Sequence, residues 1–385
     1  MSGIDPAAIA RFMAAAEAGA SGMSAASPPR YVLLGHISRA LLARIGLCAF
    51  ILISLMEILA LLEQTTAILQ RNLGVHGILT YALLHLPALI LQALPLSVLI
   101  GAVFMLTQMA LGSEIASLRA AGLSTVTLFV LMLPGTVGVA IGGMVMHEFV
   151  TPRTELALAR WWNVTSPTAL QDTRGFWFHD HGSIVHVDHF SAGGTILHGV
   201  DYYRRNAKGA LEAVSSARQA EFRQSVWEAT SLRQLDLNTN RVVISQHATE
   251  TITHSAVSPD NILILSQPYP VLSTRQIEAI LHQGAPASLP KATYRMALFE
   301  PYILPMNLCV MLLLALPVVY IPPRTGTRSM MPVAALGAGF AFIVMQGLVQ
   351  ALGNAGTLPA LLATLAPPIL ATLLAVAWLL KMEER

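Results

Sequence analysis

The sequence predicts an α-helical polytopic membrane protein with six transmembrane helices and one inserted all-β domain. Of its 385 residues, 54% are hydrophobic and only 11% are charged, whereas soluble proteins carry about 25% charged residues. Six long apolar stretches occur, and a polar stretch separates the third from the fourth. The formal net charge of +2 is close to neutral, so no nucleic-acid partner is expected.

Each apolar stretch is long enough for a membrane span, which needs about 20 residues to cross a hydrocarbon core of roughly 30 Å. The stretches cover residues 45–62, 78–111, 126–146, 301–321, 332–352 and 358–380. As a straight helix the second would measure about 51 Å, which is too long for one crossing. Its Pro87 and Pro95 therefore predict an interfacial turn followed by a kinked span.

Basic residues in the short loops set the expected orientation, because they remain on the cytoplasmic side of a bacterial inner membrane. On one side the chain carries Arg30, Arg39, Arg44, Arg119, Arg324, Arg328, Lys381 and Arg385. The other side has Arg71 in its first loop and no basic residue in its last, residues 353–357. Both termini are expected in the cytoplasm and the insert in the periplasm, with residues 1–29 as a disordered cytoplasmic tail.

The insert, residues 152–290, is predicted to be a periplasmic β-domain between helices 1–3 (residues 30–151) and helices 4–6 (residues 291–385). Short, partly alternating segments cover residues 176–178, 183–190, 195–203, 211–222, 226–237 and 241–253. Gly-, Asn- and Ser-rich breaks separate them, as in an antiparallel sandwich or jelly roll. Residues 273–284 then predict a helix with Ser273 as N-cap, Gln276 as its capping-box partner and Gly284 as its stop.

The common enzyme signatures are missing from the sequence. A nucleotide-binding loop ends in glycine followed by lysine, but none of Lys208, Lys291 and Lys381 follows a glycine. Neither a Gly-x-Ser-x-Gly elbow nor a His-Glu-x-x-His motif occurs. Cys48 and Cys309 both lie in apolar runs, which excludes a disulfide framework for the insert. A non-enzymatic protein without a cofactor is therefore expected.

An alternative function is a membrane-anchored periplasmic metallo-enzyme or sensor that uses the histidines between His179 and His189. His179, Asp180, His181, His186, Asp188 and His189 are residue types that bind zinc. However, a strand sends alternate side chains to opposite faces, so His186 and Asp188 lie on one face and His189 on the other. A solvated hairpin is the preferred interpretation.

Two polar features interrupt the spans. A carboxylate such as Glu57 costs about 2.5–3.5 kcal/mol inside a membrane. It either lines a substrate cavity or makes a protonated helix–helix hydrogen bond, and the sequence does not decide between these. Gln346, Gln350 and Asn354 recur every four residues and form one polar stripe, for which interhelical packing is the favoured explanation.

A short amphipathic helix is predicted for residues 113–121, on the cytoplasmic side. Ile115 and Leu118 are three residues apart on one side, and Gly122 ends the helix. Glu114 lies in the first turn, where the helix dipole favours an anion. The segment is either simply a stable connection or a coupling helix that enters a groove on a separate ATPase.

Taken in order, these pieces resemble the lipopolysaccharide export permease family, and its LptG-type subunit more than its LptF-type. The residues that carry the resemblance are Ser113-Glu114-Ile115, Ala121-Gly122, Glu148-Phe149-Val150-Thr151-Pro152, Gly175-Phe176-Trp177, Phe299-Glu300-Pro301 and residues 376–381. The arrangement of three spans, an insert and three spans is more specific than any one of these motifs.

The resemblance implies a transport subunit that receives lipopolysaccharide from the inner membrane. Its implied partners are a second permease subunit of the LptF type, a cytoplasmic ABC ATPase dimer and periplasmic jelly-roll bridge proteins. Glu114 would meet the ATPase together with Ile115, Leu118 and Arg119. Members of the LptG type tend to carry lysines near the outer end of the first span, which this chain lacks. Glu57, Glu63 and Arg71 remain as the candidate substrate-cavity residues, and a substrate with fewer phosphates is one hypothesis consistent with the loss.

Overall fold

The fold was analysed in a computed structural model of the chain. The structure describes residues 30–165, 175–206, 209–224, 226–237, 243–252, 257–267, 270–321 and 330–383. The expected tail, residues 1–29, lies outside the described residues, as do Arg324, Arg328 and Arg385 of the orientation argument.

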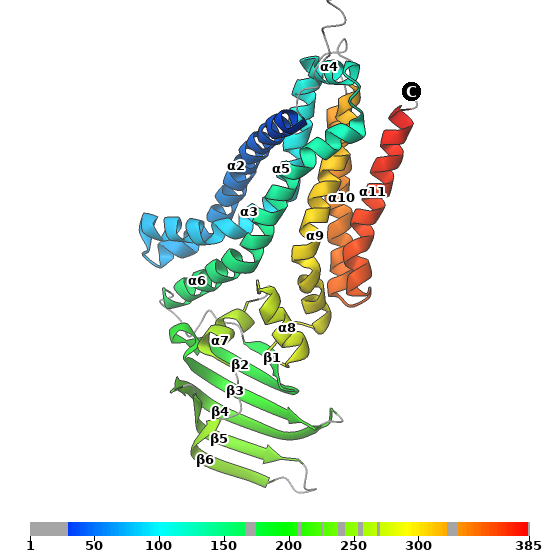
Figure 1. Cartoon of the computed structure of the whole chain (residues 1–385). Coiled ribbons are helices and arrows are strands. Elements are labelled where there is room, and N and C mark those ends of the chain that lie inside the picture. Colours follow the sequence, from blue (N-terminus) through cyan, green and yellow to red (C-terminus); the bar gives the residue numbers. More distant parts are fainter. Residues whose placement is uncertain are drawn as a thin grey trace, which may run out of the picture.

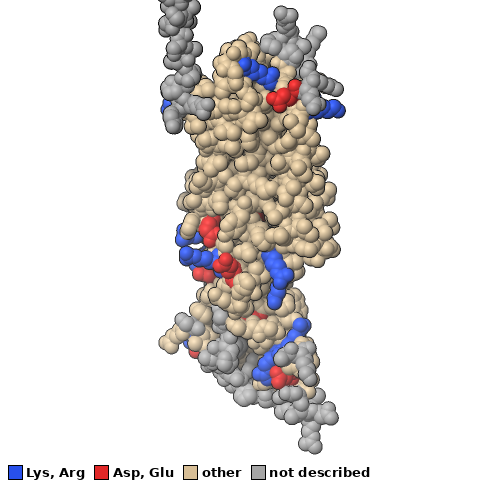
Figure 2. Space-filling model, turned by 45° about the vertical axis from the view of Figure 1, so that its right-hand side comes forward, with Lys and Arg blue, Asp and Glu red and all other residues tan. Residues whose placement is uncertain are grey.

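Six helices are long and apolar enough to cross a membrane, which confirms the predicted number of spans. They cover Leu33–Gln70, Gly74–Leu111, Thr125–Val164, Lys291–Tyr320, Met331–Asn354 and Ala360–Glu383. In Figure 1 they form a bundle, with a β-sheet beyond one end and the short helix α4 (Glu114–Ala120) and the C-terminus at the other. These ends are called the sheet side and the α4 side below. On the face in Figure 2, a broad belt without charged side chains separates charged zones, as expected for a surface that contacts lipid.

The first two spans form a long hairpin. Helix α2 (Arg30–Gln70) packs along α3 (Gly74–Leu111), and Gly101 allows the two backbones to approach closely at Ile45. Pro87 and Pro95 lie within α3. The structure therefore keeps both prolines within one continuous helix, without the separate interfacial turn that was expected. In Figure 1 the sheet-side end of this hairpin bends away sideways.

The third span does not end at the start of the insert. Helix α5 (Thr125–Val145) passes through the π-helical turn η1 (Met146–Val150) into α6 (Thr151–Val164). Pro152 lies in the first turn of α6, directly after this π-helical turn. The insert thus begins with a helix that packs on α3, and its first strand starts only at Phe176.

All six predicted strands are present, in one antiparallel sheet with the order β1-β2-β3-β4-β5-β6. The strands are β1 (Phe176–Asp180), β2 (Ser183–Ser191), β3 (Ile196–Arg205), β4 (Leu211–Arg223), β5 (Val226–Asp236) and β6 (Val243–Ile252). The described strands form a single meander rather than two packed sheets. Helix α7 (Pro259–Leu265) covers the apolar side chains of the sheet, and its Ile262 and Leu263 are buried among them.

The chain returns to the bundle through α8 (Thr274–His282), which has the predicted capping box between Ser273 and Gln276. Helix α9 (Lys291–Ala315) and the 3-10 turn η3 (Leu316–Tyr320) follow, then α10 (Met331–Asn354) and α11 (Ala360–Glu383). Helix α9 contacts α3, α5, α10 and α11, and it is the most buried of the six spans. Asn307, which lies deep in this helix, is therefore enclosed by protein.

Candidate functional site

Helix α4 (Glu114–Ala120) connects α3 to α5 at the end of the bundle opposite the sheet (Figure 1). Ser113 precedes it with a φ of 60°, and Gly122 follows it with a φ of 84°. Positive φ values let the chain turn sharply at both ends, and glycine adopts them at no steric cost. The seven-residue helix is therefore held as a compact unit between two turns.

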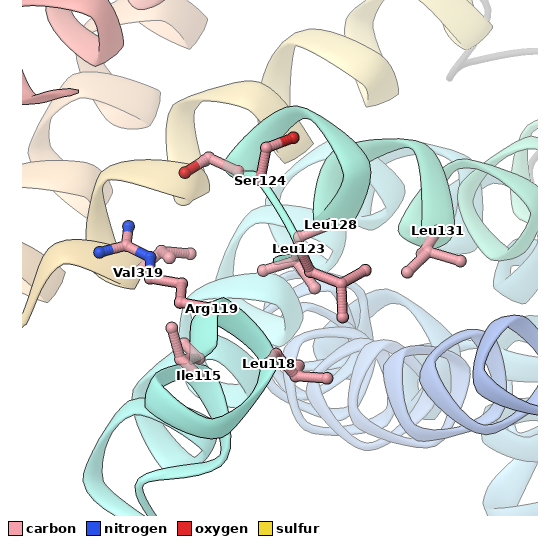
Figure 3. A pocket seen from close by; sticks show the side chains of 9 residues that line it. Ile115, Leu118, Arg119, Leu123, Ser124, Leu128, Leu131 and Val319 are labelled. Atoms are coloured by element: carbon pink, nitrogen blue, oxygen red, sulfur yellow. The ribbon is translucent and has the colours of Figure 1, made fainter. Parts of the chain in front are cut away.

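The apolar side of α4 faces its own bundle. Ile115 is 5% exposed, and the partly buried Leu118 packs against the same core. Both line a shallow pocket with Leu123, Leu128, Leu131 and Val319, as Figure 3 shows. The predicted pairing of Ile115 and Leu118 on one side of the helix is thus present, but that side anchors α4 to the membrane helices.

The two charged residues of α4 differ in their surroundings. The guanidinium of Arg119 lies 4.4 Å from the ring centre of Tyr320, whose hydroxyl is 3.1 Å from Thr125 Oγ1. The Glu114 carboxylate is exposed, and it has no hydrogen bond or ion pair with any residue that the structure describes. Of the four predicted coupling residues, Glu114 is the one whose charge is free for another molecule.

Glu57, Glu63 and Arg71 belong to the α2–α3 hairpin near its sheet-side end. Arg71 Nη1 donates a hydrogen bond of 2.5 Å to the carbonyl of Trp162, and its guanidinium lies 4.0 Å from the ring centre of that residue. Trp162 belongs to α6. Arg71 therefore joins the tip of the hairpin to α6, while Glu63 is exposed on α2.

The carboxylate of Glu57 is turned toward protein. Both of its oxygens are buried without a hydrogen-bond partner among the described atoms, and it interacts electrostatically with His85 of α3. His85 Nδ1 is in turn 3.5 Å from Glu155 Oε1 on α6. Of the two alternatives left open by the sequence, the helix–helix hydrogen bond is not formed among the described residues. His85 and Glu155 come from two other helices, so the sequence near Glu57 held no signal for them.

A cavity of about 300 Å³, lined by both apolar and polar side chains, lies between α3, α9 and α10. The stripe residues Gln346 and Gln350 line it, together with Glu300 and Asn307 of α9. An adjoining cavity of about 170 Å³ shares Glu300 and Gln350 and includes Asn354. Within the described residues the three stripe side chains make no interhelical hydrogen bond, and they line these cavities between helices. The packing explanation favoured from the sequence stays a prediction. A polar side chain within a membrane span is costly, and this applies to the amide of Asn307 as it does to Glu57. The sequence therefore held a signal for Asn307.

The histidine-rich hairpin does not gather a set of metal ligands. His186 Nδ1 lies 3.6 Å from Asp188 Oδ1 and 3.9 Å from Asp201 Oδ2, whereas His189 stacks on His198. No group of three His, Cys, Asp or Glu side chains with metal-binding geometry occurs among the residues described. The geometry gives the alternative metallo-enzyme no support.

The sequence model of the lipopolysaccharide export system permease LptF/LptG family matches residues 35–381. The chain belongs to this family. It is 22% identical to the lipopolysaccharide export system permease protein LptG of Escherichia coli (strain K12), over 88% of this chain and 95% of that protein. It is 23% identical to the LptG protein of Haemophilus influenzae, over 91% and 98% of the two chains.

As a member of the LptF/LptG family with six apolar helices, the chain is a multi-pass protein of the inner membrane. It also makes the chain a transport protein rather than an enzyme. Both relatives are LptG proteins, in agreement with the subunit type that the sequence resembled. The inserted sheet between the third and fourth spans is consistent with the fold of this family.

Proposed function

We propose that this chain is the LptG-type permease subunit of an ABC-type lipopolysaccharide exporter. With a second subunit of the LptF type it would extract lipopolysaccharide from the inner membrane and pass it to periplasmic jelly-roll bridge proteins. A separate cytoplasmic ABC ATPase dimer would supply the energy. The family match and the relatives named LptG support the transport role.

The proposed orientation follows from the distribution of basic residues. Arg39, Arg44, Arg119 and Lys381 belong to the α4 side of the bundle, which the positive-inside rule assigns to the cytoplasm. Both termini and α4 would then be cytoplasmic, and the insert of residues 152–290 would be periplasmic. On this assignment Glu57, Glu63 and Arg71 lie near the periplasmic end of α2, where we propose that they face the substrate cavity.

The free carboxylate of Glu114 is the observation that carries the coupling proposal. Ile115 and Leu118 anchor α4 in the bundle, so a force applied to Glu114 is transmitted to α3 and α5 rather than absorbed by a loose loop. An exposed carboxylate in this position can pair with a basic residue of the ATPase. Arg119, which lies over Tyr320, would contribute the neighbouring surface.

The test is to purify the tagged chain from its own membranes and to measure how much ATPase accompanies it. Glu114→Ala is expected to reduce the retained ATPase about tenfold, because a charge-assisted contact contributes roughly 1.5–3 kcal/mol, and to abolish lipid-stimulated hydrolysis. Glu383→Ala is the matched control, since Glu383 is another exposed carboxylate on the α4 side. Normal retention and hydrolysis in Glu114→Ala would rule out the coupling role.

A further inference from the structure

The cavity between α3, α9 and α10 opens near the sheet-side end of the membrane helices. Glu300 lies nine residues after Lys291, the first residue of α9, which is about 14 Å along the helix. Asn307 lies two turns further into the bundle, and Gln346 and Gln350 face both from α10. In the proposed orientation, this depth corresponds to the outer half of the bilayer, where the head group of a lipid lies.

The lining carries one negative charge and several uncharged polar groups. Glu300 is the only charged residue among the described residues that line the two adjoining cavities. The amides come from Gln92, Asn307, Gln346, Gln350 and Asn354. Lys291 and Arg295 precede Glu300 on α9 but do not line either cavity. The charge carried by the lining itself is therefore negative.

Asn307 lies in the buried wall of the cavity and carries an amide oxygen without a hydrogen bond to any described residue. Its side chain is 6% exposed, and its Oδ1 atom has no partner among the described residues. A buried amide oxygen without a hydrogen bond costs about 1–3 kcal/mol. A hydroxyl or ammonium group placed in the cavity can donate to the Glu300 carboxylate and to the amide oxygens of Gln346 and Gln350, and the glutamine amides can donate to a hydroxyl oxygen.

We propose that this cavity binds the uncharged or amine-bearing sugar part of the transported lipid and disfavours phosphate. This proposal rests on the function proposed above and adds the chemistry of the head group that the cavity binds. A phosphate could accept hydrogen bonds from the amide N–H groups, but no cation among the described lining residues offsets its repulsion by the Glu300 carboxylate. Hydroxyls and amines meet acceptors there. The volume, about 300 Å³, is at the lower end of the range of about 300–1,000 Å³ found for small-ligand sites.

The experiment uses the intact complex of this chain with its co-purified partners, in lipid nanodiscs. Two synthetic glycolipids with the same acyl chains and glucosamine disaccharide are titrated, one with two phosphates and one with none. The unphosphorylated lipid is expected to bind about tenfold more tightly, an order-of-magnitude value for repulsion between one carboxylate and one phosphate in a partly hydrated site. Tighter binding of the phosphorylated lipid would overturn the inference while leaving the export function intact.

Variants locate the source of the selectivity. Glu300→Lys is expected to reverse the preference, and Glu300→Gln to reduce it to within about twofold. Asn307→Leu is expected to weaken binding of the unphosphorylated lipid about tenfold, because it replaces a polar amide of the lining with an apolar side chain of similar size. Glu278→Lys, on the exposed face of α8, makes the same charge change outside the cavity and should leave the preference unchanged.

The outcomes distinguish a failure of the proposed head-group selectivity from a failure of the proposed export function. A wild-type preference that persists unchanged in Glu300→Gln would show that the cavity is not its source and would overturn the inference. If neither glycolipid binds, the export function itself fails and the inference fails with it. Recovery of the complex and its thermal unfolding temperature establish that each variant is folded, and Glu300→Gln keeps the test decisive if the lysine variant is not.

Discussion

Glu148 caps helix α8 from a position 126 residues away in the sequence. Its Oε2 atom accepts hydrogen bonds from the backbone N–H of Thr274, at 3.0 Å, and from its hydroxyl, at 2.7 Å. Glu148 belongs to the π-helical turn η1, which continues the third span, whereas α8 leads from the sheet to the fourth span. The contact therefore joins the two points at which the chain leaves and re-enters the bundle.

Removal of this cap should loosen the junction between the sheet and the membrane helices. Glu148→Ala is expected to destabilise the start of α8 by about 1.5–3 kcal/mol, since it removes two charge-assisted hydrogen bonds. Amide exchange in residues 274–277 should then accelerate at least about tenfold, as 1.4 kcal/mol corresponds to a factor of ten. Glu278→Ala, at an exposed position of the same helix, is the control. Equal amide exchange in the two variants would show that the capping box of Ser273 and Gln276 is sufficient to hold the start of α8.

The contact between Arg71 and Trp162 predicts that the α2–α3 hairpin is held to α6. Trp162→Leu removes the ring below the guanidinium but keeps the carbonyl that accepts its hydrogen bond. Arg71→Ala removes both interactions. In a double-mutant cycle on thermal stability, the coupling energy of the two residues is expected to be about 1–2 kcal/mol.

The same pair of variants separates structure from substrate binding. If Arg71 acts by holding the hairpin, lipid transport should fall to a similar extent in Trp162→Leu and Arg71→Ala. If Arg71 contacts the lipid itself, only Arg71→Ala should impair transport. A coupling energy of zero would contradict the structural role, whatever the transport result.

Features encoded by neighbouring residues were predictable from the sequence. The capping box of α8 needs only Ser273 and Gln276, and it was predicted correctly. The six strands followed from alternation and turn residues, such as the two-residue turn of His181 and Gly182, whose positive φ values of 45° and 84° suit a tight hairpin. Helix α6 was not predicted, because residues 152–290 were assigned as a whole to the β-domain, whereas Pro152 lies in the first turn of a helix that continues the third span.

Features that depend on distant helices were not predictable. Glu57 attracts attention in any apolar span, but its environment is created by His85 and Glu155 on two other helices. The spacing of Gln346 and Gln350 correctly placed both on one side of α10. Whether such amides bind each other or line a cavity depends on the helices opposite, here α3 and α9, and periodicity carries no information about those.

At Gly101, any added side chain is expected to push the first two spans apart. A Cβ atom there would lie 2.9 Å from both the Cα and the N atom of Ile45, and backbone atoms cannot move aside as a flexible side chain can. Gly101→Ala is therefore expected to destabilise the protein by about 1–3 kcal/mol despite the better helix propensity of alanine. Thermal unfolding in detergent measures the effect.

Gly46 provides the matched control for this prediction. It lies in α2, next to Ile45, but a Cβ atom there would meet nothing within 4 Å. Gly46→Ala should leave the stability unchanged or raise it by up to about 1 kcal/mol. If both variants respond alike, helix propensity rather than the close approach of α2 and α3 decides the outcome.

The stacked pair of His189 and His198 predicts that the sheet loses stability in mild acid. Their ring centres are 4.6 Å apart, with 12° between the planes. Burial, and secondly the neighbouring His189, lower the pKa of His198 below its ordinary value of about 6.5. The unfolded chain then takes up a proton at a higher pH than the folded chain does. Stability is therefore fully present above about pH 6.5 and declines as the pH falls below that value.

Thermal unfolding of the intact protein between pH 7.5 and pH 5.0 checks this expectation. His198→Gln should flatten the decline, because glutamine does not titrate. His189→Gln should flatten it in part, since it removes the neighbouring charge but not the burial of His198. His282→Gln, at the exposed end of α8, controls for the loss of a histidine elsewhere. If the decline is equally steep in wild type and His198→Gln, the acid sensitivity arises outside this histidine pair.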